Sequence, residues 1–271
     1  MDAEPRLRLA VAGPITTSCD SDANLAVAEA AAERAAAAGA ALLVLPQGFL
    51  TGGPAGGSAK AEASAILSDG PAARALGGVA RRHRLALVCG YVERCSGRHH
   101  DAALFVDNTG CALANYRRTH LVPEDEVAGL AQGHWMNLVA FGGCKLGLLL
   151  GADVEAPEPA RALALAGAAA LLVPAAHDAA VAPILAALLA TRAFENGCAV
   201  AYANGHCDPD APGSCILGPG GELLAGDSAG FAVADVPLAQ PHVAAQRLAA
   251  RRPQLYQKLT AAPAQMDVPR T

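Results

Sequence analysis

The sequence predicts an α/β fold in which strands and helices alternate along the chain. Short, fully apolar runs bounded by turn residues, such as Ala41–Leu45 and Leu146–Leu150, have the pattern of strands buried within a sheet. Longer Ala-rich stretches with helix-capping residues lie between such runs, as from Asp22 to Gly39. We therefore expect a sheet buried on at least one face, and one domain over residues 1–271 with a core at about 7–256.

In the first half, the boundaries of the elements are set by particular residue types. Asp22 can cap the first helix, and Gly39 suits its C-terminus. Pro71 can begin the second helix, because its φ is already helical and its missing N–H is not needed there. The expected elements are a strand at Arg6–Gly13, a helix from Asp22 to Gly39, a strand at Ala41–Leu45, a helix at Pro71–His83, and strands at Ala86–Tyr91, Ala102–Val106 and Ala112–Tyr116.

The second half repeats this mixture. The Gly-Pro-Gly-Gly sequence at 218–221 is typical of a turn and predicts a hairpin. The expected elements are strands at Leu146–Leu150, Leu171–Val173, Ala199–Ala203 and Phe231–Val236, helices at Glu158–Ala166 and Pro183–Glu195, and a hairpin at Cys215–Leu224.

Composition and charge exclude several classes of protein. Hydrophobic residues make up 53% of the chain and charged residues 17%, which argues against disorder. The net charge of −5 predicts neither a nucleic-acid partner nor a membrane partner. The acidic N-terminus does not resemble a signal peptide, and the apolar runs are too short to span a bilayer. We expect a soluble cytoplasmic protein.

No cofactor or metal is expected. The Gly-rich loop from Thr51 to Ser58 lacks the Lys-Ser/Thr ending of a phosphate-binding loop, although a loop of this kind near a site can act as a lid. The cysteines are scattered, as is typical of free thiols in an intracellular chain. Cys89, Cys95, His99 and His100 are close in sequence, but their spacing fits no common zinc pattern.

Five segments, taken in order, carry motifs of one known family. The segment LPQGF at 45–49 is similar to a strand and turn in which Pro-Glu is followed by Phe, and YRRTHL at 116–121 resembles Tyr-Arg-Lys-x-His-Leu. LLLGAD at 148–153, followed by Pro-Glu at 157–158, resembles a strand ending in Cys-Tyr-Asp. The distal pieces are RAFENG at 192–197 with Ala203-Asn204 and GPGGE at 218–222, and then RRPQLY at 251–256. Together these segments resemble the nitrilase (carbon–nitrogen hydrolase) superfamily, and the resemblance implies a four-layer α-β-β-α sandwich, usually paired into dimers.

The resemblance also implies a catalytic Glu, Lys and Cys, and it places them at Gln47, Arg118 and Gly151. In the family chemistry, the Glu is a general base, the Cys attacks the carbonyl or nitrile carbon, and the Lys stabilises the negative charge that develops. Gly151 has no side chain with which to form a thioester, and an amide such as Gln47 does not take up a proton at neutral pH. Arg118 keeps a positive charge, but the charge is carried by a planar, forked guanidinium group.

Further residues are expected to bind substrate by the same resemblance. Glu126 follows His120 where the family often has a second Glu, although the neighbouring Glu124 and Asp125 leave that register open. Ala152 and Asp153 follow Gly151, and Asp153 matches an Asp that orients the turn.

The departures from the family residues at Gln47, Arg118 and Gly151 leave two functions open. The first is a pseudoenzyme without thioester-type hydrolysis of amides or nitriles, which binds a small molecule or a protein partner. The alternative is a repurposed enzyme that performs acid–base, cyclisation or condensation chemistry on an amide- or carboxylate-bearing small molecule in the same pocket. In either case we expect a homodimer, with the helix around Arg192 and the segment near Arg252 at a two-fold interface.

Overall fold

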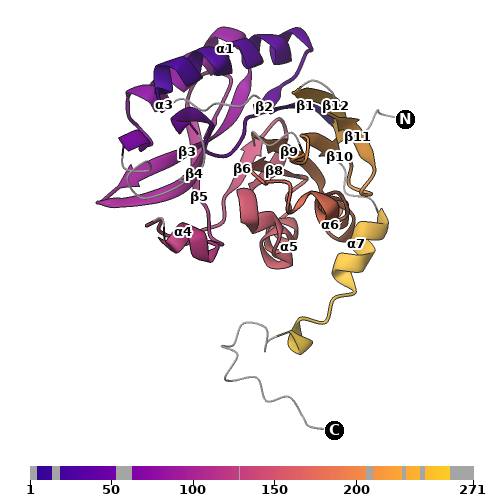
Figure 1. The fold of residues 1–271 in the computed structure, drawn as a ribbon. Coiled ribbons are helices and arrows are strands. Elements are labelled where there is room, and N and C mark those ends of the chain that lie inside the picture. Colours follow the sequence, from indigo (N-terminus) through magenta and orange to yellow (C-terminus); the bar gives the residue numbers. More distant parts are fainter. Residues whose placement is uncertain are drawn as a thin grey trace.

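A computed structural model describes residues 5–13, 19–52, 63–127, 129–205, 210–227, 230–238 and 242–256. Two six-stranded sheets lie face to face, and helices cover the outer face of each, as Figure 1 shows. The four-layer α-β-β-α arrangement expected from the sequence is therefore confirmed.

The first sheet is built from the N-terminal half and the last strand. Its strand order is β12-β1-β2-β3-β4-β5, with β2 parallel to both β1 and β3 and the other pairs antiparallel. Helices α1 (Ser21–Ala37) and α3 (Pro71–His83) cover its outer face. The strands are β1 (Arg6–Ala12), β2 (Leu42–Val44), β3 (Ala86–Cys95), β4 (Arg98–Val106), β5 (Ala112–Arg117) and β12 (Phe231–Pro237).

The second sheet has the order β11-β10-β9-β8-β7-β6, with parallel pairing between β7, β8 and β9. Helices α5 (Pro157–Leu165) and α6 (Ala182–Asn196) cover its outer face. The strands are β6 (Leu138–Phe141), β7 (Cys144–Leu148), β8 (Ala170–Ala175), β9 (Ala199–Asn204), β10 (Cys215–Leu217) and β11 (Leu223–Gly226).

Three apolar layers hold the sandwich together. The central layer joins the inner faces of both sheets, with Val44 and Phe105 from one sheet and Leu148 and Leu172 from the other. Each remaining layer packs one sheet against its own helices. Burial of this apolar area is the main favourable contribution to folding, and it explains why the strands read as near-continuous apolar runs in the sequence.

Several boundaries differ from the sequence prediction. Asp20, not Asp22, caps α1, and its carboxylate accepts hydrogen bonds from the backbone N–H groups of Asp22 and Ala23. Strands β3 and β4 extend beyond their apolar runs into polar residues, because cross-strand pairing continues to Cys95 and Arg98. Strand β6, the short helix α4 (Pro123–Val127) and helix α7 (His242–Ala249) were not expected.

Strand ends position the site. Gln47 follows β2, Arg118 follows β5 and Gly151 follows β7, so that residues far apart in sequence meet at one edge of the sandwich. A short 3₁₀ turn, η1 (Phe49–Thr51), follows Gln47. Most of the Gly-rich loop that the sequence suggested as a lid lies outside the described residues. None of the helices in the described ranges has the length and apolar character of a membrane span.

Candidate active site

Gln47 is held in a tight turn after β2. Its backbone N–H donates to the carbonyl of Ala175 at 3.3 Å, which ties the turn to the second sheet. Gly90 on β3 allows the turn to approach, because a Cβ there would lie only 2.4 Å from the Pro46 carbonyl oxygen. The Gln47 side chain is 6% exposed.

Gly151 begins the 3₁₀ turn η2 (Gly151–Val154), three residues after Leu148, the last residue of β7. Its φ of +51° lies in the left-handed region that favours glycine. A Cβ at this position would lie 2.4 Å from Oε1 of Gln47. The amide of Gln47 therefore fills the space in which a side chain at position 151 would begin.

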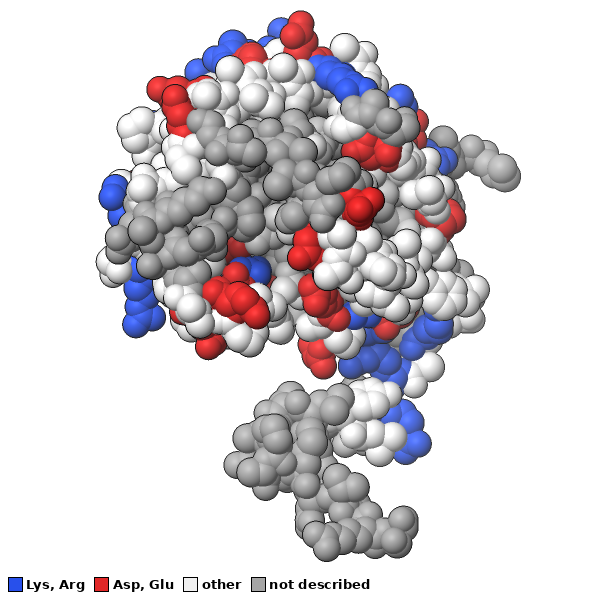
Figure 2. Space-filling model, viewed as in Figure 1, with Lys and Arg blue, Asp and Glu red and all other residues white. Residues whose placement is uncertain are grey.

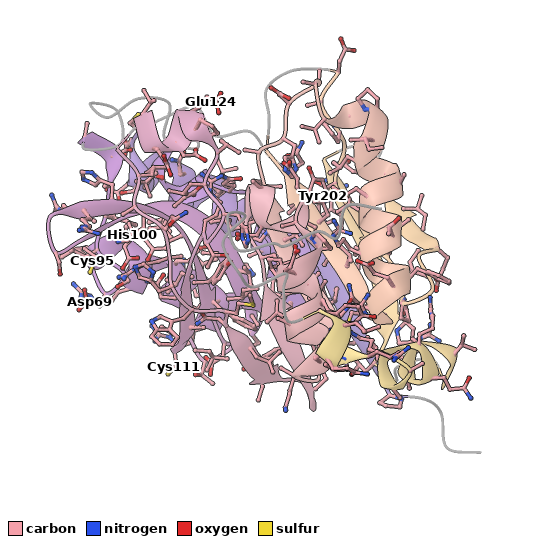
Figure 3. The ribbon with its side chains drawn as sticks, turned by 90° about the horizontal axis from the view of Figure 1, so that it is seen from below. Asp69, Cys95, His100, Cys111, Glu124 and Tyr202 are labelled. Carbon is pink, nitrogen blue, oxygen red and sulfur yellow. The ribbon has the colours of Figure 1, made fainter. Side chains whose placement is uncertain are left out.

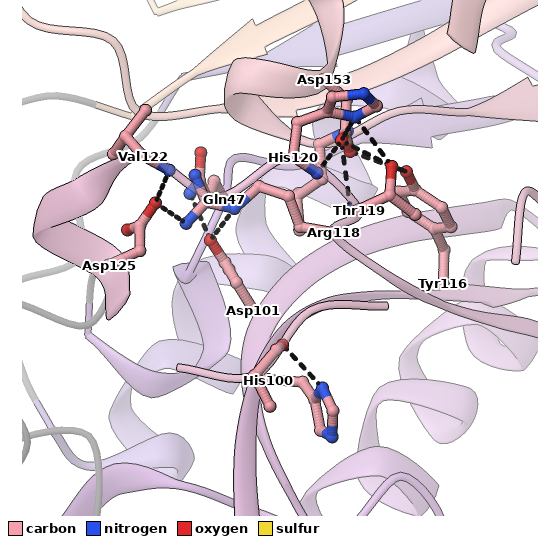
Figure 4. A network of polar contacts seen from close by, with 12 residues as sticks. Gln47, His100, Asp101, Tyr116, Arg118, Thr119, His120, Val122, Asp125 and Asp153 are labelled. Atoms are coloured by element: carbon pink, nitrogen blue, oxygen red, sulfur yellow. Dashed lines mark hydrogen bonds and ion pairs between the residues drawn. The ribbon is translucent and has the colours of Figure 1, made fainter. Parts of the chain in front are cut away.

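Arg118 meets two carboxylates beside this turn. Gln47 donates through Nε2 to Oδ2 of Asp101 at 2.5 Å, and Nε of Arg118 approaches the same oxygen to 3.2 Å (Figure 4). Nη2 of Arg118 lies 2.7 Å from Oδ2 of Asp125. Gln47, Asp101, Arg118 and Asp125 are called the Asp101 cluster below, and Gln47 is the member that lies against Gly151.

Asp101 is the carboxylate at the centre of this cluster and is 1% exposed. Burial raises the pKa of Asp101 to about 6, against the lowering effects of the Arg118 charge and the Gln47 hydrogen bond. Its second oxygen, Oδ1, is buried and has no hydrogen-bond partner among the described residues. The cluster thus combines a permanent cation with a carboxylate that still has a free acceptor oxygen.

The segment after His120 brings a carboxylate to Arg118, but from the residue that precedes the expected Glu126. Glu126 is exposed, and the carboxylate that pairs with Arg118 is that of Asp125. Both residues lie in helix α4, in which successive side chains point about 100° apart, so only one of them can face Arg118.

Asp153 has internal partners for both of its oxygens. Oδ1 accepts hydrogen bonds from the backbone N–H groups of Thr119 and His120, and Oδ2 accepts from Tyr116 and from the N–H of Leu150, as Figure 4 shows in part. These bonds connect the segment that carries Arg118 to the turn that carries Gly151. Asp153 thereby orients the site, while the adjacent Ala152 is half-buried.

Sequence reasoning missed Asp101, and also His177. His177 follows β8 and is 8% exposed; its Nδ1 lies 2.9 Å from the Tyr202 hydroxyl, and its Nε2 lies 3.3 Å from Oε1 of Glu155. Burial lowers the pKa of His177, against the raising effect of the Glu155 carboxylate. The sequence does contain an indication of Asp101, since this carboxylate directly precedes the apolar run of β4.

The cysteines and histidines at the edge of the first sheet form no metal centre in the described part of the chain, where no group of three or more potential ligands converges. Figure 3 shows Cys95 and His100 on the paired strands β3 and β4. The ring of His100 contacts the carbonyl of Ala131 at 2.8 Å. Burial raises the pKa of the Cys89 thiol, which disfavours the thiolate needed to bind a metal.

Residues 8–243 match the family model for carbon–nitrogen hydrolases. The chain belongs to the carbon–nitrogen hydrolase family. This result agrees with the order of motifs in the sequence and with the two packed sheets.

Curated carbon–nitrogen hydrolase relatives support the same assignment. A protein of Pseudomonas protegens described as "Hydrolase in pqqF 5'region" is 36% identical over 231 residues, which cover 81% of this chain and 80% of that protein. An (R)-stereoselective amidase of a Pseudomonas species is 33% identical over 155 residues, 57% of this chain and 55% of that protein.

Among solved structures, an amidase from Nesterenkonia sp. superposes with a TM-score of 0.79 at 30% identity, covering 96% of this chain and 98% of the amidase. A variant of the amidase from Nesterenkonia sp. AN1 is described as carrying acrylamide added at its active-site cysteine.

These carbon–nitrogen hydrolases correct the function expected from the sequence. The prediction of a binding or regulatory pseudoenzyme is wrong, because the relatives and structural neighbours are hydrolases and amidases and point to an active enzyme. They likewise favour hydrolysis over the cyclisation or condensation chemistry of the alternative. The carboxylate of Asp101, which contacts Gln47 and Arg118, is a reactive group that the residue types at the three family positions do not reveal.

Proposed function

We propose that this chain hydrolyses the carbon–nitrogen bond of small amides at the Asp101 cluster. The observation that carries the proposal is the meeting of Arg118 and a buried carboxylate beside Gly151, in a chain similar to hydrolases and amidases. A fixed cation at this point can stabilise the oxyanion that forms when an amide carbon is attacked.

In this proposal, Gln47, Arg118 and Gly151 occupy the positions at which family members carry the Glu, Lys and Cys of the catalytic triad. Gly151 provides no sulfur, so water is the nucleophile and no acyl-enzyme forms. Oxyanion stabilisation and binding alone leave hydrolysis only about 10³–10⁴-fold faster than in water, so attack by water also needs a group that takes up its proton. Ala152 and Asp153 contribute by shaping the turn against which the substrate lies.

Ammonia release from simple amides tests this function. The full-length protein is incubated with a panel that includes acrylamide and butyramide, the amides bound in solved variants of the Nesterenkonia amidase. We expect catalytic ammonia release without any mass increase of the intact protein, because no covalent intermediate forms. The Glu93→Gln variant, which alters a buried ion pair with Arg117 outside the cluster, is expected to retain the activity. Ammonia at the level of the protein-free blank for every amide would refute the proposal.

We also propose that the chain forms a two-fold dimer through α6 and the segment after α7. Arg192, expected at the interface, is instead 6% exposed and donates to the carbonyls of Val154 and Glu155. The apolar side chains available for pairing are Phe194, 51% exposed, and Leu255, 60% exposed. Figure 2 shows basic side chains gathered at the lower edge, where the chain after α7 leaves the body.

Sedimentation equilibrium tests the dimer. The wild-type chain is expected to sediment as a dimer at micromolar concentration, and the double variant Phe194→Asp with Leu255→Asp as a monomer, because two charges would be buried without partners. The exposed Val127, on α4, gives a control, and Val127→Asp should leave the dimer intact. A monomeric wild-type chain at this concentration contradicts the proposal.

A further inference from the structure

The Asp101 cluster needs a proton acceptor if water is to attack an amide. Gln47 cannot serve, because an amide does not take up a proton at neutral pH. The cluster contains two carboxylates, and their hydrogen-bond partners distinguish them. One oxygen of Asp125 is shared between Arg118 and the backbone N–H of Val122, to which it lies at 2.9 Å, and the Asp125 side chain is 15% exposed.

Asp101 differs from both neighbouring aspartates. The nearby Asp153 is saturated by backbone and hydroxyl donors on both oxygens. In Asp101, Oδ2 is engaged by Gln47 and Arg118 while the buried Oδ1 has no hydrogen-bond partner in the described chain. A buried carboxylate oxygen without a donor is costly for stability, and such groups persist at functional sites.

We propose that Asp101 is the general base of this site, accepting the proton of the water molecule that attacks the amide carbon. The inference rests on the proposed amide hydrolysis and assigns its missing base. Gln47 links the base to the place of reaction: its Nε2 donates to Asp101, and its Oε1 lies where a side chain of Gly151 would begin. In this proposal the attacking water donates one hydrogen to Oε1 of Gln47 and the other to Asp101.

The reaction balances without any further reactant. Asp101 takes a proton from water, and the oxygen of the resulting hydroxide bonds to the amide carbon while the carbonyl electron pair moves to oxygen, where Arg118 faces the negative charge. When that pair returns, the carbon–nitrogen bond breaks and the nitrogen takes the proton from Asp101. One water and one amide give one carboxylic acid and one amine or ammonia, and Asp101 is again ionised.

The electrostatic surroundings suit this role. The charged groups that face Asp101 are Arg118, Asp125 and Asp153; the first lowers the pKa of Asp101 and the other two raise it, while burial has the largest effect and brings it to about 6. Such a carboxylate is ionised at pH 7 yet is a stronger base than an ordinary aspartate.

The test compares the wild-type chain with Asp101→Asn in kcat/KM for the best amide of the panel, from pH 5 to pH 9. Wild-type activity is expected to rise with pH through about 6 and then to level off, because the base must lose its proton. Asp101→Asn is expected to lower kcat/KM by about 10²–10⁴-fold and to abolish that rise. The double variant Gln47→Glu with Asp101→Asn exchanges the amide and the carboxylate of this hydrogen-bonded pair. Because it restores a carboxylate at the neighbouring position, it is expected to regain part of kcat/KM and its rise with pH.

Glu93→Gln provides the matched control, since Glu93 is also 1% exposed and also pairs with an arginine, Arg117. It should lower stability while keeping the pH-dependent rise. If the wild type hydrolyses amides and Asp101→Asn keeps both the rate and the rise, Asp101 is not the base and the proposed function stands. If the wild type releases no ammonia, both the function and the base are overturned.

Discussion

Asp153→Ala is expected to lower the free energy of unfolding by at least about 3 kcal/mol. The side chain of Asp153 is buried and accepts hydrogen bonds from the backbone N–H groups of Leu150, Thr119 and His120. Each buried N–H left without an acceptor costs about 1–3 kcal/mol, and alanine supplies no acceptor. Urea denaturation monitored by circular dichroism measures the change.

Asp235→Ala is the control for this substitution. Asp235 pairs with Arg8 at 2.6 Å, but its side chain is 49% exposed, so its loss should cost about 1 kcal/mol or less. Equal destabilisation by the two substitutions would show that Asp153 does not hold the turn. Asp153→Asn, which keeps one acceptor oxygen, is expected to fall between them.

The pH dependence of stability gives a second measure of the same contacts. Asp153 raises the pKa of His120 above its ordinary value of 6.5 through the contact of its Oδ1 with the ring Nδ1. Because the folded-state pKa is raised, this contribution to stability is fully present below pH 6.5 and is lost as the pH rises through the folded-state pKa. The stability difference between wild type and Asp153→Ala should therefore shrink as the pH is raised from 5 to 8. His120 is 42% exposed, so the shrinkage is expected to be small.

Arg118→Met is expected to cost about 3–5 kcal/mol at pH 8, because it leaves the buried Asp101 without a compensating charge. The cost should be smaller at pH 5. There Asp101 can take up a proton, and without Arg118 its pKa rises above the wild-type value of about 6. Urea denaturation of both proteins at the two pH values measures the difference. The proposed hydrolysis should be abolished as well, since it assigns to Arg118 the cation that faces the oxyanion.

Arg8→Met removes an arginine of a largely exposed ion pair and should cost about 1 kcal/mol or less at either pH. An Arg118→Met variant whose destabilisation does not change between pH 5 and pH 8 would argue against a buried charge on Asp101. A variant as stable as the wild type would argue against the ion pair itself.

The sequence by itself determined the alternation of strands and helices. The apolar runs of β2, β7 and β8 identify strands buried on both faces, because a sheet covered on both sides admits few polar residues. Pro71 marks the start of α3 and is its first residue. Elements without such a signal, among them β6 and α4, were missed because short, mixed segments carry no clear periodicity.

Only some of the residues of the candidate site could be predicted from the sequence. The order of motifs located Gln47, Arg118 and Gly151, and the turns after β2 and β7 bring them together. Only the tertiary structure decided that Asp125 rather than Glu126 meets Arg118, since that depends on how α4 is turned against the sheet. It also revealed Asp101, whose neighbours Gln47 and Arg118 lie 54 and 17 positions away in the chain. The chemistry of a carboxylate depends on burial and on neighbouring charges, and those are set by folding and not by residue type.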